Sequence, residues 1–255
     1  MKKLIASIAL IIPTVAFAAG GHGPALDKAH VDVQDTASLQ RGAKMFVNYC
    51  MGCHSMQYMR YNRLAEDLGL TEEQVLENLA FGDQKIGEPM TISMPKDRSK
   101  DWFGKTPPDL TVIARSRGED WLYSFLRGYY ADPGKPTGVN NIYFPDVGMP
   151  HVLASLQGVQ KAVFHENEDA NGVVHKTFEG FELAEAGALT SIGDNGEADT
   201  KKYDRAVRDL VNFLSYAGEP AQLKRAELGP YVIGFLIIFT ILSWFLKKEY
   251  WKDVH

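Results

Sequence analysis

Cysteine is nearly absent from this sequence, with two residues in a chain of 255, so the fold cannot depend on a network of disulfides. A surplus of basic residues is also missing. Because 27 Lys and Arg face 32 Asp and Glu, for a formal net charge of −5, nucleic-acid binding has no support. Long apolar runs are confined to the two ends. The roughly 210 residues between them are enough for one water-soluble domain with its own core.

Both cysteines lie in one short motif, Cys50-Met51-Gly52-Cys53-His54. This C-x-x-C-H string is the covalent attachment signature of c-type haem, in which Cys50 and Cys53 form thioethers and His54 becomes an axial iron ligand. We therefore expect one covalently bound haem c, no disulfide, and a fold stabilised by packing around the porphyrin. A thioredoxin-like enzyme would instead need a βαβ pattern around the cysteines, which does not fit this sequence.

The N-terminus has the pattern of a secretory signal peptide. Two lysines precede an apolar stretch from Leu4 to Val15, and the small-x-small triplet Ala16-Phe17-Ala18 follows. An N-terminal membrane anchor is the alternative, but about a dozen apolar residues are too few to span a bilayer. We expect residues 1–18 to be removed and the haem domain, residues 19–228, to be exported to the periplasm.

The C-terminal apolar segment predicts a transmembrane helix. Residues 229–246 contain no charged side chain, and eighteen residues are close to the length that crosses a hydrocarbon core. Tyr231 and Trp244 lie near the two ends of this segment, and Lys247-Lys248 follow it directly. We therefore expect a single-pass protein of the bacterial inner membrane, in contact with lipid, whose tail 247–255 is cytoplasmic.

The domain between these ends is predicted to be mainly α-helical with long loops. Helices are expected over 38–49, 71–79, 118–130 and 200–216, and irregular loops over 81–108 and 132–150. The last helix has the clearest apolar stripe, and its polar face, which includes Asp204, Arg208 and Asp209, is expected to be solvated. This order is typical of a cytochrome c-type haem domain, in which the first and last helices cross beside the haem.

Residues 161–199 are expected to form a small β-hairpin excursion, because the pattern alternates weakly and Asn171-Gly172 is a strong turn signal. The stretch is acidic, with nine carboxylates against two lysines. It could be a docking patch for a basic electron acceptor, or a solvated loop without such a role. The sequence leaves both interpretations open.

The sixth iron ligand is predicted to be a methionine in a proline-bearing loop. His/Met ligation raises the reduction potential of a haem. Met149 follows the helix expected over 118–130 and precedes the last one, which is the expected order, whereas Met94 would suit only a very compact cytochrome. His151 is a rival ligand, but bis-His ligation would normally lower the reduction potential, and a surface position would also explain this histidine. Four methionines close to His54 are expected to be core residues: Met45, Met51, Met56 and Met59.

Several segments together resemble the cytochrome c1 family, the haem subunits of cytochrome bc1 complexes. The resemblance runs in order from about Gly42 to the C-terminus. It is carried by residues 50–64 around the haem motif, Pro107-Pro108-Asp109-Leu110-Thr111 with Arg115-Ser116-Arg117, residues 143–150 around Met149, and residues 213–220 before the anchor. Residues 81–106 look shorter than in mitochondrial relatives, and residues 161–199 have no clear counterpart.

The resemblance implies roles for particular residues. It favours Met149 as the second axial ligand and implies that an arginine, Arg117 or Arg115, pairs with a haem propionate. Trp121 stands near an aromatic position beside the propionates. The two prolines before Asp109 are expected to shape the pocket wall and to bind nothing.

The resemblance also implies a function and partners. Electrons would pass from a Rieske iron–sulfur protein to a cytochrome c, within a dimeric multisubunit quinol–cytochrome c reductase that contains cytochrome b. This chain would carry no bond-making catalytic site. The alternatives are a membrane-anchored monohaem cytochrome serving a different oxidase or reductase, and a haem-based sensor with a vacant sixth site.

Overall fold

The computed structural model describes residues 24–168 and 174–253, so the expected signal peptide lies outside the described residues. The α-helices are α2 (Thr36–Tyr49), α3 (Tyr61–Leu68), α4 (Glu72–Leu79), α5 (Lys96–Phe103), α6 (Ile113–Arg117), α7 (Glu119–Arg127), α8 (Ala154–Gln157), α9 (Lys201–Gly218) and α10 (Gln222–Tyr250). The strands are β1 (Met56–Arg60), β2 (Pro89–Met90), β3 (Tyr129–Ala131), β4 (Val139–Asn141), β5 (Gly158–Glu168), β6 (Val174–Ala186), β7 (Ser191–Ile192) and β8 (Ala198–Asp199). Each strand pairs with its neighbour in the chain.

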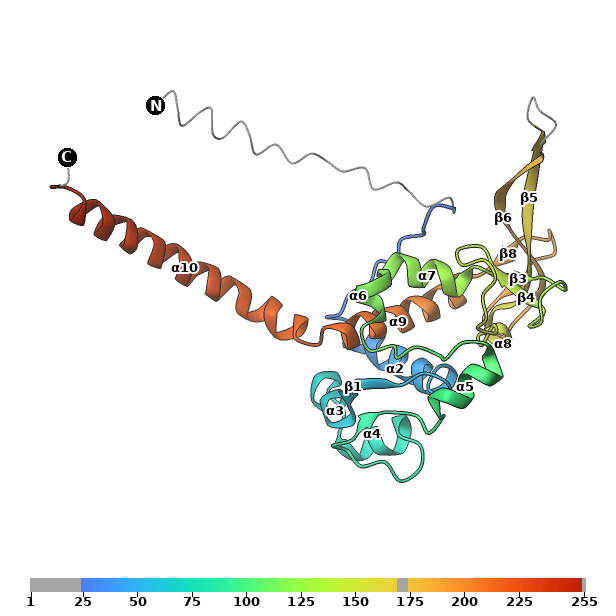
Figure 1. Cartoon of the computed structure of the whole chain (residues 1–255), viewed down its shortest axis with the longest axis horizontal. Helices are drawn as coiled ribbons and strands as arrows, with labels where there is room; N and C mark the ends of the chain where they lie inside the picture. The colour runs from blue at the N-terminus through green and yellow to red at the C-terminus, as the bar shows by residue number, and fades with distance from the viewer. Residues whose placement is uncertain (1–23, 169–173, 254–255) are drawn as a thin grey trace.

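The first and last helices of the domain, α2 and α9, lie side by side (Figure 1). Gly42 permits this close approach, because a Cβ there would collide with the Asp209 carbonyl oxygen and lie 2.7 Å from Phe213 Cβ. Polar contacts lock the crossing: Ser38 Oγ donates to Asp209 at 2.7 Å, and Arg41 donates to both carboxylate oxygens at 2.6 and 2.9 Å. The predicted solvated position of Asp209 is therefore wrong, since its side chain is buried against α2.

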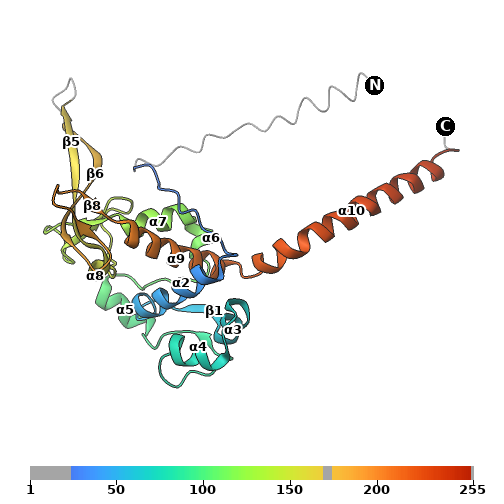
Figure 2. The same cartoon turned by 180° about the vertical axis from the view of Figure 1, so that it is seen from behind.

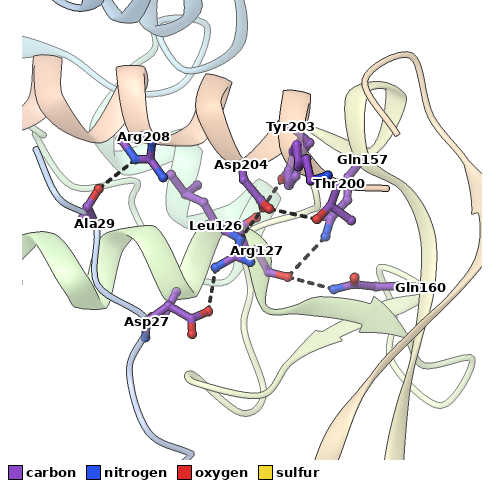
Figure 3. A network of polar contacts seen from close by, with 12 residues as sticks. Asp27, Ala29, Leu126, Arg127, Gln157, Gln160, Thr200, Tyr203, Asp204 and Arg208 are labelled. Carbon is purple, nitrogen blue, oxygen red and sulfur yellow. Dashed lines mark hydrogen bonds and ion pairs between the residues drawn. The ribbon is translucent and has the colours of Figure 1, made fainter. Parts of the chain in front are cut away.

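A second group of polar contacts surrounds Arg127 at the end of α7 (Figure 3). Its guanidinium pairs with Asp27 at 2.6 Å and with Asp204 of α9 at 2.7 Å. Close by, Arg208 of α9 donates to the Ala29 carbonyl at 3.0 Å. These contacts fasten the N-terminal segment across α7 and α9. They also show that the polar face of α9 is partly an interface, where the sequence predicted a solvated surface.

The hairpin of β5 and β6 stands away from the helices (Figures 1 and 2). The strands pair antiparallel from Gly158↔Ala186 to Glu168↔Val174, so the ladder begins before the predicted Lys161. Its root is fixed to the domain, because the buried Gln160 amide donates to the carbonyls of Arg127 and Tyr129 at 2.8 and 2.5 Å. The outer residues of β5 are exposed. The Asn171-Gly172 turn signal lies outside the described residues.

The last helix, α10, extends away from the domain (Figures 1 and 2). It contains the predicted transmembrane segment 229–246, and none of its residues is buried. By length and composition it is the one helix among the described residues that could cross a membrane. It begins seven residues before the predicted segment, at Gln222, and includes Pro230. At the junction Glu219 pairs with Arg115 of α6 at 2.5 Å and with Arg225 of α10.

Three further predicted stretches differ from the structure. The loop predicted over 132–150 to be irregular contains the strand β4. The stretch 81–108, predicted to be loop, contains α5 and the short strand β2. The sequence of α5, KDRSKDWF, lacks an apolar stripe, and only Ser99 of the helix is buried, so periodicity could not reveal it. The helix predicted over 118–130 ends earlier, at Arg127, and is preceded by α6. Gly118 separates the two helices with a φ of 89°, which suits glycine.

Candidate haem-binding site

The C-x-x-C-H motif begins at the C-terminal end of α2. The amide of Cys50 still donates to Phe46 O at 2.8 Å, as a helical residue would. The chain then turns back, because the amides of Cys53 and His54 both donate to the Cys50 carbonyl, at 3.1 and 2.9 Å. Both thiols are free, and burial, with a smaller effect of Cys53, raises the pKa of the Cys50 thiol to about 12. The tight turn therefore brings two thiols and one imidazole together from five consecutive residues.

The His54 imidazole is oriented by a single backbone carbonyl. His54 Nδ1 lies 2.7 Å from Pro108 O, and because a carbonyl only accepts hydrogen bonds, Nδ1 must carry the proton. The lone pair is then on Nε2, which is the arrangement that an imidazole ligand to iron requires. Burial also lowers the pKa of His54, which favours the neutral ring. The donor set of this structure thus fits a covalently attached haem.

The segment after Pro108 is hydrogen-bonded to the residues that directly follow the motif. The Leu110 amide donates to Ser55 O at 2.9 Å, and the Gln57 amide donates to the Asp109 carboxylate at 2.8 Å. Pro108 was expected only to shape the pocket wall. Its carbonyl instead orients the imidazole, a role that no sequence pattern signalled, since every residue has a carbonyl.

An aromatic cluster lies on one face of α7 and its continuation. Trp121 stacks on Phe125 at 4.9 Å between ring centroids, and Phe125 meets Tyr129 edge-on at 5.4 Å. Phe144, from the loop after β4, packs edge-on against Trp121 and Phe125 at 6.3 and 6.4 Å. The guanidinium of Arg117 lies 5.0 Å from the Trp121 ring centroid, a cation–π distance. The structure therefore brings the predicted residues Arg117 and Trp121 together.

Arg115 lies apart from this cluster. Its guanidinium pairs with Glu219, just before the anchor helix, and its Cγ lies 3.2 Å from where a Cβ on Gly218 would stand. Both arginines come from α6, but only Arg117 contacts the aromatic residues within the described part of the chain. Of the two arginines predicted from the sequence, Arg115 is thus committed to the junction between the domain and α10.

Met149 is half-buried and packs against the core cluster. Tyr129 reaches it, donating its hydroxyl hydrogen to the Met149 carbonyl at 3.3 Å. Met94 is also half-buried, but within the described residues it is not among the side chains packed against that core. The methionines near His54 are core residues as expected: Met51, Met56 and Met59 are buried, and Met45 packs on the core.

The interpretation of His151 as a surface residue is wrong. Its ring stacks on Tyr129 at 4.7 Å with an interplanar angle of 7°, and its Nε2 atom is buried without a hydrogen-bond partner. Burial lowers the pKa of His151 to about 4, against a smaller opposing effect of the Gln157 amide. His151 is thus a neutral ring packed beside the Met149 loop. Stacking between residues 22 positions apart could not be predicted from the sequence.

Comparison with known proteins gives a consistent result. The model of the Cytochrome C1 family matches residues 27–254. The chain is 50% identical to cytochrome c1 of Allochromatium vinosum over all 255 residues, covering both chains completely. It is 42% identical to a Nitrosomonas europaea protein named ammonia monooxygenase gamma subunit, over 100% of this chain and 99% of that one. It is 29% identical to cytochrome c1 of Rhodospirillum rubrum, over 86% of this chain and 83% of the relative.

Proposed function

This chain belongs to the cytochrome c1 family, and on that premise we propose that it is a monohaem subunit that passes electrons from a Rieske iron–sulfur protein to a cytochrome c. Family membership makes it a c-type cytochrome electron-transfer subunit of a bc1 complex. The structural observation that carries the proposal is the hydrogen bond from His54 Nδ1 to Pro108 O, because it leaves Nε2 to bind iron.

Four residues hold the haem in this proposal. Cys50 and Cys53 would attach it through thioethers, while His54 Nε2 and the Met149 sulfur would bind its iron. When bound, the haem supplies a one-electron couple between ferric and ferrous iron, whose potential a Met ligand raises. The packing of Met149 against the core supports its choice over Met94.

Arg117 is the residue that we propose to pair with a haem propionate. Its guanidinium is permanently charged and offers a forked set of donors that matches a carboxylate. The contact with Trp121 supports this choice, because stacking on the indole limits where the guanidinium can lie. Arg115 is engaged by Glu219 and is assigned to the junction.

The membrane arrangement follows from α10. We propose that residues 1–18 direct export, that the haem domain lies in the periplasm, and that the tail after Leu246 is cytoplasmic. Lys247 and Lys248 at the end of the apolar segment support this orientation, since positive charge is retained on the cytoplasmic side. The domain would then lie at the membrane surface, within reach of cytochrome b and the Rieske protein in a dimeric complex.

The ligand assignment is tested by replacing each methionine in turn. We expect Met149→Leu to lower the reduction potential and to abolish the weak sulfur-to-iron charge-transfer band of the ferric protein, since leucine has no donor atom. Met94→Leu is the matched control and should leave both unchanged. Loss of the band in Met94→Leu instead would overturn the assignment. An unchanged spectrum in both variants would favour a sensor with a vacant sixth site.

The complex assignment is tested by mild detergent extraction and purification through a tag after His255. We expect cytochrome b and a Rieske protein to copurify. The second candidate is a membrane cytochrome serving another oxidoreductase, and the 42% identical relative named as a monooxygenase subunit is the observation that favours it. Copurification of a different oxidoreductase, without cytochrome b, would establish that alternative.

A further inference from the structure

The loop that carries Met149 is irregular, so specific contacts must fix its position. Before Met149 the loop is held by two asparagines of β4. Asn141 Oδ1 accepts from the amides of Tyr143 and Phe144 at 2.9 and 3.2 Å, and Asn140 Oδ1 accepts from the Asp146 amide at 2.9 Å. After Asp146 the chain reaches Met149 without regular structure, and α8 begins only at Ala154.

Tyr129 is the residue that contacts this last part of the loop. Its ring is buried and fixed on two sides, by Phe125 edge-on at 5.4 Å and by the stacked ring of His151 at 4.7 Å. Its hydroxyl donates to the Met149 carbonyl at 3.3 Å, the one hydrogen bond to Met149 in the described part of the chain. Tyr129 thus holds the loop at the sulfur-bearing residue, through the carbonyl of Met149, and two residues after it, through the ring of His151.

The backbone of Tyr129 is in turn hydrogen-bonded to the root of the hairpin. The Gln160 amide donates to the Tyr129 carbonyl at 2.5 Å, and the Gln157 amide donates to the Arg127 carbonyl at 3.2 Å. These buried glutamines fix the backbone on either side of Gly128. Tyr129 therefore has a rigid support, which a side chain must have if it is to position another residue.

We propose that Tyr129, clamped between Phe125 and His151, is a positioning residue that holds Met149 in place as an iron ligand. The inference rests on the proposed ligation by Met149. A thioether is a weak donor, so its bond to iron depends on the loop delivering the sulfur without strain. Loss of a partner outside the ligand sphere typically costs 10–100-fold in metal affinity, and the hydroxyl of Tyr129 is such a partner.

The test compares two buried tyrosines in the full-length holoprotein. Tyr129→Phe removes the hydroxyl that reaches Met149. Tyr203→Phe is the matched control, because Tyr203 is equally buried and its hydroxyl donates to another carbonyl, that of Leu126, at 2.9 Å. We expect Tyr129→Phe to weaken the sulfur-to-iron charge-transfer band and to raise the affinity of the reduced protein for carbon monoxide about tenfold. Tyr203→Phe should change neither.

Substitutions of His151 test the second contact of Tyr129, the stacking of its ring on the imidazole. His151→Phe keeps an aromatic ring against Tyr129 and should behave like the wild type, whereas His151→Ala should raise carbon monoxide binding. Equal carbon monoxide binding by Tyr129→Phe and Tyr203→Phe, or by His151→Ala and His151→Phe, would overturn the proposal. Met149→Leu distinguishes a failure of the Tyr129 proposal from a failure of the ligand assignment. It abolishes the charge-transfer band only if Met149 is the ligand.

Discussion

At the scale of single residues, the crossing of α2 and α9 depends on Gly42. We expect Gly42→Ala to destabilise the protein by about 1–3 kcal/mol, because the new methyl group would collide with the backbone carbonyl of Asp209, which cannot rotate away. The gain in helix propensity, at most about 1 kcal/mol, opposes this effect without cancelling it. Urea unfolding of the holoprotein, followed by far-UV circular dichroism, measures the difference.

Gly180 in β6 provides the control for this substitution. A Cβ at Gly180 would have no neighbour within 4 Å, so Gly180→Ala should be neutral or slightly stabilising. The contrast in sign between the two Gly→Ala variants identifies the helix crossing as the cause. Equal stabilities would mean that α2 and α9 can separate at Gly42 without loss of packing.

Single residues also mark the limit of what the sequence could predict about the site. Cys50, Cys53 and His54 could be proposed as haem attachment residues because their chemistry acts between neighbours in the chain. The partners of the polar groups are remote. His54 meets a carbonyl 54 residues away, and Asp209 meets Ser38 across 171 residues. No local pattern reports such pairs, which is why Asp209 was wrongly predicted to be solvated.

At the scale of elements, the β5–β6 hairpin is held to the domain mainly by contacts at its root, where Gln160 bonds the backbone after α7. We expect Gln160→Ala to destabilise the protein by about 1–3 kcal/mol, because it removes the glutamine donor to the Tyr129 carbonyl and leaves the Arg127 carbonyl with Gln157 alone. Hydrogen exchange should accelerate in β5 and β6 before it does in α2 and α9. The measurement is hydrogen–deuterium exchange with mass spectrometry, together with urea unfolding.

The exposed ion pair of Lys176 with Glu166 provides the control on the outer hairpin. Lys176→Ala should leave the stability almost unchanged, since exposed ion pairs contribute little. If Lys176→Ala cost as much as Gln160→Ala, the hairpin would be stabilised along its length, and the root would have no special importance.

The elements differ in how well periodicity predicted them. The helix expected over 200–216 corresponds to α9, because that helix buries a full apolar stripe against the core. The helix α5 was missed, because it buries only Ser99 and its pattern is that of a charged loop. Burial, rather than helix formation itself, is what periodicity detects.

At the scale of the whole molecule, the haem domain and α10 are built on different principles. The domain closes around one core, to which α2 and α9 contribute most of their apolar side chains. Helix α10 has no buried residue, and its apolar side chains face outward on all sides. Its link to the domain is local: Leu223 packs against the core, and Arg225 pairs with Glu219. The domain should therefore fold without the anchor.

Truncation after Glu227 tests this independence while keeping Leu223 and Arg225. We expect the shortened chain to appear in the soluble periplasmic fraction with haem attached. Its urea midpoint should match that of the full-length protein in detergent, because the removed residues contribute no buried surface to the domain. Cell fractionation with haem staining, followed by urea unfolding, provides the measurement. A truncated chain that stays in the membrane pellet, or that unfolds at a clearly lower urea concentration, would mean that α10 helps to hold the haem domain as well as anchoring it.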